Sequence, residues 1–394
     1  VFNTPPTATV DLRDGPLHPN WLQGARLNIV ESCFQAAPEA TAIVAAEEGQ
    51  EDLTTWTYGE LEQLVNRVAA GLRLHGFSAG DAIAIYMPMN AECVAAYLGI
   101  IRAGCIVVSI ADSFAAPEVA RRLEIAGAAG IITVDAYLRG GRRVELYDTV
   151  REAGAPRAVD LLHVDDAPPD LRPGDLTWSD LVSIDGTAER SLAAPEAVTN
   201  ILFSSGTTGD PKAIPWTQLT PIKCAMDGHF HQDIRSGDVV CWPTNIGWMM
   251  GPWLVYASLV NRATMALYEG VPTGTGFAEF VRASQVSILG VVPSIVRAWR
   301  ASESIDAGAL ASVGRGRERL TLSAGTAPRS RRPRGTCPRF RLAQVARRTR
   351  SDRSGSSAPG QATSASPRRR PSHGRRPPRT SRLRGSGRTA RRSR

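Results

Sequence analysis

The chain reads Ile201-Leu202-Phe203-Ser204-Ser205-Gly206-Thr207-Thr208-Gly209-Asp210-Pro211-Lys212 in the stretch that says most about its fold. Three apolar residues, typical of the end of a β-strand, run directly into four hydroxyl side chains, two glycines and a lysine. Glycine permits positive φ and close approach of the backbone to a ligand, while hydroxyls, N–H groups and a lysine charge suit phosphate oxygens. The composition predicts a phosphate-binding loop, with a triphosphate as its natural ligand.

The spacing of this loop excludes a Walker A motif, which needs four residues between its glycines and Lys-Ser/Thr directly after the second. Only two residues separate Gly206 from Gly209. A plain surface turn after a strand is the other reading, but a turn needs only one or two such residues. The loop instead resembles the signature loop of adenylate-forming enzymes, which include acyl-CoA synthetases, luciferases and the adenylation domains of peptide synthetases.

The charge of the chain changes sign after residue 300, although the whole carries +8. Residues 301–394 contain 25 Arg and four acidic residues, which gives +21, so the remaining 21 basic and 34 acidic residues leave −13 for residues 1–300. The basic segment has too little apolar surface to offset its ordering entropy. We expect residues 301–394 to be a disordered tail rich in Arg, Ser, Gly and Pro.

Helical and strand patterns alternate along the rest of the chain. Thr57 and Glu60 form a capping-box signature, apolar residues follow at helical spacing, and Gly76 closes that helix. Strands are expected at residues 81–86, 105–110, 130–134, 239–242, 265–268 and 288–292. Further helices are expected at 92–102, 117–125, 253–259, 277–283 and 294–300, and residues 151–190 read as a surface excursion. Close alternation of strand and helix predicts parallel pairing and an α/β layered fold.

Other motifs fall in the order and approximate spacing found in acetyl-CoA synthetases and related short-chain acyl-CoA synthetases. They are Thr57-Tyr58 with Glu60-Leu61, residues 84–88, Gly237-Asp238-Val239, Gly247-Trp248-Met249-Met250-Gly251 and Glu269-Gly270. Residues 211–217 and 247–254 most resemble plant acyl-activating enzymes of the peroxisomal type. The resemblance covers residues 25–300. It implies an incomplete large N-terminal domain of the adenylate-forming fold, layered α/β/α, after an N-terminal extension at residues 1–24.

The resemblance implies an acid–thiol ligase. In that family a carboxylate attacks the α-phosphate of MgATP to give an acyl-adenylate and pyrophosphate, and the thiol of CoA then displaces AMP. The loop would wrap the β- and γ-phosphates, and Lys212 would assist catalysis. The implied ATP-phosphate residues are Ser204, Ser205, Gly206, Thr207, Thr208, Gly209 and Lys212, with ATP, Mg²⁺ and CoA as cofactors and a small carboxylic acid as substrate.

For three further groups of residues, the sequence allows both a functional and a purely structural interpretation. Trp248, Met249, Met250 and Gly251 would line an acyl pocket by resemblance, or the two methionines belong to the core. Residues 137–143 resemble the glycine-flanked segment that meets the 3′-phosphate of CoA, with Arg139 and Arg142 as ligands, or they form a solvated basic turn. His229 and His231 have strand spacing and could share a metal, but a surface strand pair is favoured and no metal is expected.

The scattered cysteines contain no C-x-x-C pair, so reduced and mostly buried thiols are expected. No apolar run reaches the roughly 18–20 residues of a membrane span, and the N-terminus lacks a secretory pattern. We expect a soluble intracellular body, in the cytoplasm or, by resemblance, the peroxisome. The chain ends Arg391-Arg392-Ser393-Arg394 instead of the Ser-Lys-Leu address, and Val1 in place of Met suggests a fragment.

After residue 300 the remaining motifs of the family are missing from the sequence. Residues 324–327 only echo an adenine-binding turn, no acidic residue accompanies them, and no lysine follows Lys223. We therefore expect no appreciable synthesis of acyl-CoA and a tail that reads like translation in another frame. The alternative is a noncatalytic nucleotide-binding remnant whose basic tail binds nucleic acid non-specifically through charge.

Overall fold

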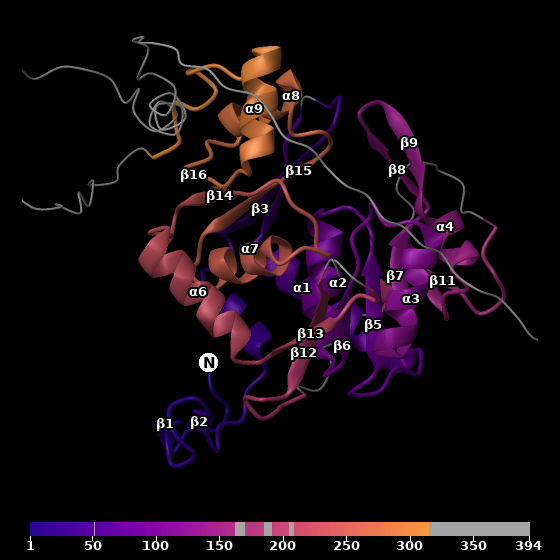
Figure 1. Cartoon of the computed structure of the whole chain (residues 1–394), viewed down its shortest axis with the longest axis vertical. Helices are drawn as coiled ribbons and strands as arrows, with labels where there is room; N and C mark the ends of the chain where they lie inside the picture. Colours follow the sequence, from indigo (N-terminus) through magenta and orange to yellow (C-terminus); the bar gives the residue numbers. More distant parts are fainter. Residues whose placement is uncertain (51, 162–169, 185–190, 205–208, 315–394) are drawn as a thin grey trace, which may run out of the picture. The chain divides into compact units, whose positions relative to one another are not determined.

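The computed structural model describes residues 1–50, 52–161, 170–184, 191–204 and 209–314. Within them the chain forms two mainly parallel sheets with helices between them and on their outer faces (Figure 1). This arrangement confirms the predicted α/β class and the predicted parallel pairing. It also divides the predicted strands between two sheets, which the sequence pattern did not distinguish.

The first sheet contains seven strands in the order β11-β10-β7-β5-β6-β12-β13. All neighbours are parallel except β12 and β13, which are antiparallel. Its central strand β5 is buried along its whole length, as expected for an apolar strand covered on both faces. The strands are β5 (Ala82–Tyr86), β6 (Ile106–Ser109), β7 (Ala128–Val134), β10 (Ala158–Leu161), β11 (Leu176–Thr177), β12 (Val198–Phe203) and β13 (Ala213–Thr217).

The second sheet contains five strands in the order β16-β14-β15-β3-β4, parallel except for the pair β3 and β4. These strands are β3 (Thr41–Glu47), β4 (Thr54–Thr57), β14 (Val239–Cys241), β15 (Thr264–Glu269) and β16 (Ile288–Leu289). Two antiparallel hairpins complete the strands described: β1 (Ala8–Asp11) with β2 (Asn20–Gln23), and β8 (Ala136–Arg139) with β9 (Arg142–Glu145).

Helices α1, α2 and α7 occupy the layer between the sheets: α2 contacts β5 and β6, α1 contacts β3 and β4, and α7 contacts β14 and β15 (Figure 1). Helices α3 and α4 contact the first sheet, and the aromatic rings of α8 and α9 pack on the second. The helices are η1 (Ile29–Cys33, 3₁₀), α1 (Tyr58–Leu74), α2 (Ala91–Arg102), α3 (Ala116–Ala126), α4 (Leu146–Glu152), α5 (Trp178–Val182), α6 (Thr220–His231), α7 (Met250–Leu259), α8 (Thr275–Ala283) and α9 (Pro293–Ser302).

Helix α1 shows how closely local signals fix an element. Thr57 Oγ1 accepts from the Glu60 N–H at 3.1 Å, and the Glu60 carboxylate accepts from the Thr57 N–H at 2.8 Å, which confirms the capping box. Gly76, with φ of +93°, follows the helix in the left-handed region that favours glycine. Residues at helical spacing between these two signals turn inward and are buried.

The prediction of a surface excursion at residues 151–190 was wrong for the part that the structure describes, residues 151–161 and 170–184. Strands β10 and β11 in this segment extend the first sheet, and α5 follows them. The carboxylate of Asp175 joins the parts, because it accepts from the N–H of Ala158 at 2.8 Å and from Arg172 Nε at 2.8 Å. Two short strands among Pro and Asp carry too little periodicity to be recognised in the sequence.

His229 and His231 lie near the end of helix α6, so their assignment to a strand was also wrong. Positions two apart on a helix face different directions, and the two imidazoles cannot act as a strand pair. A short alternation of polar and apolar residues at a helix end imitates strand periodicity. Only the longer apolar pattern of the helix, at Pro221, Cys224, Ala225 and Gly228, shows its buried face.

Strand β13 lies at one edge of the first sheet as described, and Pro215 lies opposite Ile201 within it. Bonded and non-bonded residue pairs alternate along an antiparallel ladder. Because the Ser204 N–H donates to the Lys212 carbonyl at 3.0 Å, Pro215 falls at a non-bonded pair and its nitrogen points away from β12. The proline therefore removes no hydrogen bond from the sheet.

The described fold continues past Arg300, since Ile305, Leu310 and Val313 pack on the second sheet's outer cluster. The predicted disorder and nucleic-acid binding of the tail lie, from residue 315, outside the described residues and stay predictions. Five cysteines lie in the described part, and all are free and buried, as predicted for them. No helix described in the structure is long and apolar enough to cross a bilayer.

Candidate functional site

Strand β12 ends at Phe203, which confirms the predicted end of the strand just before the segment predicted to bind phosphate. The two arms of the loop are joined at its base: the Ser204 N–H donates to the Lys212 carbonyl at 3.0 Å, and the Lys212 N–H donates to Ser204 Oγ at 3.3 Å. Lys212 is exposed, and no atom of the described residues would lie within 4 Å of a Cβ atom on Gly209. Ser205, Gly206, Thr207 and Thr208 lie outside the described residues.

Helix α3 contacts Asp210 in one arm of this loop and Phe203, the residue just before the other arm. Arg121 binds the carboxylate of Asp210 with two hydrogen bonds, from Nε at 3.1 Å and from Nη2 at 2.7 Å. These bonds hold the pKa of Asp210 below its ordinary value. The guanidinium of Arg122 faces the ring of Phe203, whose centroid lies 5.6 Å from its central carbon. Strands β6 and β12 are parallel neighbours, so their carboxyl ends lie side by side. Helix α3 follows β6, and the loop follows β12.

The connection between β6 and α3, residues 110–115, also packs against the predicted acyl-pocket segment. A Cβ atom on Gly247 would lie 2.1 Å from the backbone nitrogen of Ala111, so only glycine fits there. The ring of Phe114 meets Trp248 edge-on, with centroids 5.8 Å apart. One short connection therefore joins the phosphate loop, through α3, to the neighbourhood of Trp248.

The four residues predicted for the acyl pocket differ in exposure. Trp248 and Met249 are 45% and 58% exposed, Met250 is half-buried, and Gly251 is buried. The reading of both methionines as core residues is wrong for Met249, while Met250 packs against the main core. Trp248 and Met249 thus present apolar surface that a ligand or a further part of the protein can cover.

The predicted CoA-binding segment forms the hairpin β8–β9, whose turn contains Gly140 and Gly141, both with positive φ. Such a pair is the sequence signal for a two-residue hairpin. Arg139 lies 3.7 Å from the Asp112 carboxylate and donates to Tyr137 Oη at 3.4 Å. Arg142 is exposed, and it makes no ion pair with any residue in the described part of the chain. Of the two predicted arginines, Arg142 is the one available to a phosphate.

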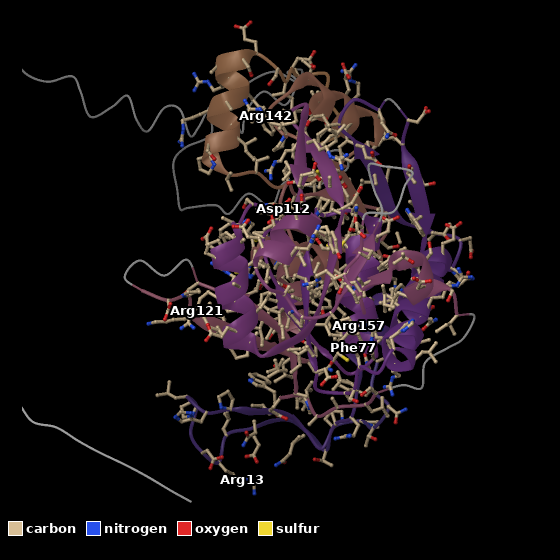
Figure 2. All side chains as sticks on the ribbon, turned by 90° about the vertical axis from the view of Figure 1, so that its right-hand side faces the viewer. Arg13, Phe77, Asp112, Arg121, Arg142 and Arg157 are labelled. Atoms are coloured by element: carbon tan, nitrogen blue, oxygen red, sulfur yellow. The ribbon has the colours of Figure 1, made fainter. Side chains whose placement is uncertain are left out.

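Asp112, which the sequence analysis did not single out, lies in the β6–α3 connection and contacts the predicted CoA-binding hairpin. Its carboxylate is buried at the end of β6 and accepts from Tyr137 Oη at 2.9 Å. Burial is the largest influence on this group and raises its pKa, against the opposing effects of Arg139 and Tyr137. The only signal for it in the sequence was an acidic residue just after the apolar run at residues 105–110. Asp112 lies between Arg142 and Arg121 in the view of Figure 2.

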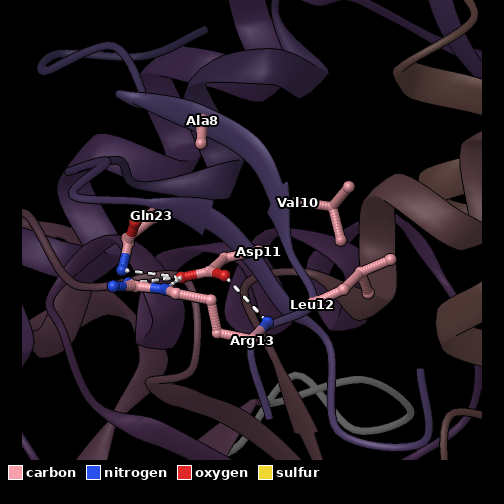
Figure 3. Close-up of a pocket in the computed structure, with 6 residues that line it drawn as sticks. All are labelled: Ala8, Val10, Asp11, Leu12, Arg13 and Gln23. Atoms are coloured by element: carbon pink, nitrogen blue, oxygen red, sulfur yellow. Dashed lines mark hydrogen bonds and ion pairs between the residues drawn. The ribbon is translucent and has the colours of Figure 1, made fainter. Parts of the chain in front are cut away.

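A shallow, open hollow lies on the β1–β2 hairpin, away from these residues in the chain (Figure 3). Arg13 Nε donates to Asp11 Oδ2 at 2.7 Å beside it. The hollow is lined by Ala8, Val10, Asp11, Leu12, Arg13 and Gln23. None of these carries a predicted role, and we place the candidate site at the strand ends instead, where residues 110–115 and α3 contact the predicted segments.

Comparison with known proteins identifies the family of the chain. The sequence profile of the family described as AMP-binding enzyme matches residues 30–341, most of the chain. The chain belongs to this family. Among curated relatives, this AMP-binding protein is 47% identical over 299 residues to hexanoyl-CoA synthase of Cannabis sativa, covering 72% of the chain and 41% of the relative. It is 45% identical to probable acyl-activating enzyme 18, peroxisomal, of Arabidopsis thaliana, covering 78% and 44%.

A solved structure, acetoacetyl-CoA synthetase from Streptomyces lividans, superposes on this AMP-binding fold with a TM-score of 0.70 and 29% identity, covering 77% of this chain and 48% of that one. The predicted membership of the acyl-CoA synthetase and plant acyl-activating group is confirmed. The chain spans less than half the length of the curated relatives named above.

Proposed function

We propose that the chain carries the phosphate-, acyl- and CoA-contacting part of an ATP-dependent acyl-CoA synthetase. The observation that supports this best is the β6–α3 connection, which touches the Gly247 segment through Ala111, the CoA-type hairpin through Asp112, and the phosphate loop through α3. In open α/β sheets, ligands bind beyond the carboxyl ends of parallel strands. Three predicted subsites thus meet at one such edge.

Each subsite has a physical role in the proposed reaction. Lys212, with the hydroxyls and N–H groups of the loop, would balance the charge that develops on departing pyrophosphate. Trp248 and Met249 would contact an acyl group of small or modest size, and Arg142 would meet the 3′-phosphate of CoA. Mg²⁺ would enter with the triphosphate, as is common for ATP enzymes. We also propose that catalysis is impaired in this chain, and that its compartment is the cytoplasm or the peroxisome.

We expect Lys212→Ala to weaken MgATP binding about tenfold, because an exposed cation at the base of the loop is lost. Gly206→Val should also weaken binding, since a branched Cβ intrudes on a loop that needs close backbone approach. Isothermal titration calorimetry measures both. Lys223→Ala on helix α6 is the matched control, because it removes the same charge from another place and should leave affinity unchanged. Equal affinity in all four proteins would disprove the phosphate-loop assignment.

The second prediction concerns CoA. Arg142→Ala should weaken binding of CoA about tenfold and leave dephospho-CoA unaffected, because only the former carries the 3′-phosphate that a guanidinium would bind. Arg151→Ala in α4 is the control for loss of a surface arginine. The assignment of the hairpin fails if Arg142→Ala weakens both ligands to the same degree.

A further inference from the structure

Arg122 is a buried cation at the edge of the candidate site. It is 6% exposed, and Nη1 donates to the carbonyl of Glu118 at 2.8 Å. Its Nε is buried and has no hydrogen-bond partner among the described residues. An arginine carries five N–H donors, so this side chain is poorly satisfied by its surroundings. A buried polar group in that state calls for an explanation.

The guanidinium lies over two aromatic rings. Its central carbon lies 3.9 Å from the centroid of Phe114 and 5.6 Å from that of Phe203. Phe203 is the last residue of β12, and the phosphate loop begins at the next position. Phe114 in turn contacts Trp248. The cation is therefore packed between the entry to the loop and the ring that borders the predicted acyl site.

The charge of Arg122 is weakly compensated. It forms no ion pair with any carboxylate in the described part of the chain. Glu118 attracts it, but the Glu118 side chain accepts from the N–H of Ala115 at 3.3 Å at the start of α3. Burial of a charge without a partner is unfavourable, and contact with an aromatic face offsets only part of that cost. A positive charge is kept here at the expense of stability.

We infer that Arg122 is a positioning residue of the phosphate loop, which fixes Phe203 and supplies buried positive potential to the anionic part of the ligand. This inference rests on the proposed function. Arg121, the preceding residue, binds Asp210 in the other arm of the loop. Consecutive residues of α3 thus contact one arm of the loop and the residue that precedes the other arm. The positive charge of Arg122 attracts each negative charge of the ligand. Its contribution to binding affinity should therefore increase with the number of phosphates in the ligand.

The test compares Arg122→Met with the unmodified chain in calorimetric titrations of ATP, ADP, AMP and inorganic tripolyphosphate. Met keeps most of the volume and removes the charge. We expect affinity to fall about tenfold for ATP and tripolyphosphate, about threefold for ADP and hardly at all for AMP. Arg282→Met changes the net charge equally at an exposed position of α8, a helix that packs on the other sheet, so it should leave every affinity unchanged.

Thermal unfolding separates positioning from a structural role. Arg122→Met should not lower the unfolding temperature, because an apolar side chain suits this site at least as well as an unpaired charge. Arg122→Lys, which keeps the charge, covers the case in which Met prevents folding and should retain the ATP preference over AMP. Equal loss for all ligands, or an unchanged ratio of ATP to AMP affinity, overturns the inference alone. Failure of the unmodified chain to bind ATP and tripolyphosphate overturns both it and the proposed function.

Discussion

Gly247→Ala should lower the free energy of unfolding by about 3 kcal/mol, at the upper end of what overpacking costs. The new methyl group would lie 2.1 Å from the nitrogen of Ala111, and within 2.5 Å of its Cα and of the Ile110 carbonyl carbon. All three are backbone atoms in a buried connection, so no side chain can rotate away. Chemical denaturation followed by circular dichroism measures the loss.

The matched control is Gly209→Ala. Its Cβ would have no atom of the described residues within 4 Å and its φ lies outside the positive region, so we expect a change in stability of less than about 0.5 kcal/mol. If both variants unfold alike, the close packing of residues 247 and 111 is wrong, and with it the link between the acyl segment and the β6–α3 connection.

Asp175→Ala should cost about 3 kcal/mol of stability, because it removes one partner of a largely buried ion pair. The Asp175 side chain is 3% exposed and accepts from Arg172, from the N–H of Ala158 and from Tyr147 Oη. Arg172 would keep only the carbonyls of Ala155 and Pro156. Asp148→Ala, whose pair with Arg151 lies on the surface, is the control and should change stability by less than about 1 kcal/mol.

Asp175 should also make the stability of the fold depend on pH. Burial, the largest single influence, raises the pKa of Asp175, but Arg172, Ala158 and Tyr147 together lower it below 3.8. A lowered pKa means that the contribution to stability is present above the unfolded value near 3.8 and is lost as pH falls through the folded value. Asp175→Asn should therefore reduce the acid sensitivity of unfolding.

Asp112 should change the stability of the fold with pH in the opposite direction to Asp175. Its pKa is raised, so its contribution is present below the unfolded value and is lost as pH rises through the folded value. Unfolding midpoints measured across pH 2.5–7 (a range chosen to span roughly the carboxyl pKa values) compare Asp112→Asn with Asp175→Asn. Two variants that shift the pH profile in the same direction would contradict these environments.

Local signals in the sequence were enough for elements that carry their own start and stop. Helix α1 is defined by Thr57, Glu60 and Gly76, and β12 is defined by an apolar run that ends in the glycine loop. Strands β10 and β11 were missed because what holds them is the contact of Asp175 with Ala158, seventeen residues away. That contact has no local pattern. Division of the strands between two sheets likewise depends on pairs distant in sequence, such as β3 with β15.

The residues of the candidate site could likewise be predicted from the sequence only in part. Lys212, Trp248 and Arg142 could be selected by residue type and resemblance, since each lies in a recognisable motif. Asp112 and Arg122 could not, because their importance comes from burial and from partners brought in by folding. In the sequence, Arg122 is one of two adjacent arginines on a helix. Only the structure shows that Arg121 forms a surface ion pair with Asp210, whereas Arg122 lies over two aromatic rings.

Pro215 gives the edge of the first sheet a property that concerns association between molecules. An open strand edge is a template on which another chain can add a strand, and proteins blunt such edges with proline or charge. The nitrogen of Pro215 points outward without a donor, three residues after the charged Lys212. The strand that carries one arm of the loop is thereby a poor seed for edge-to-edge aggregation, and the backbone beside the loop stays available to a small ligand.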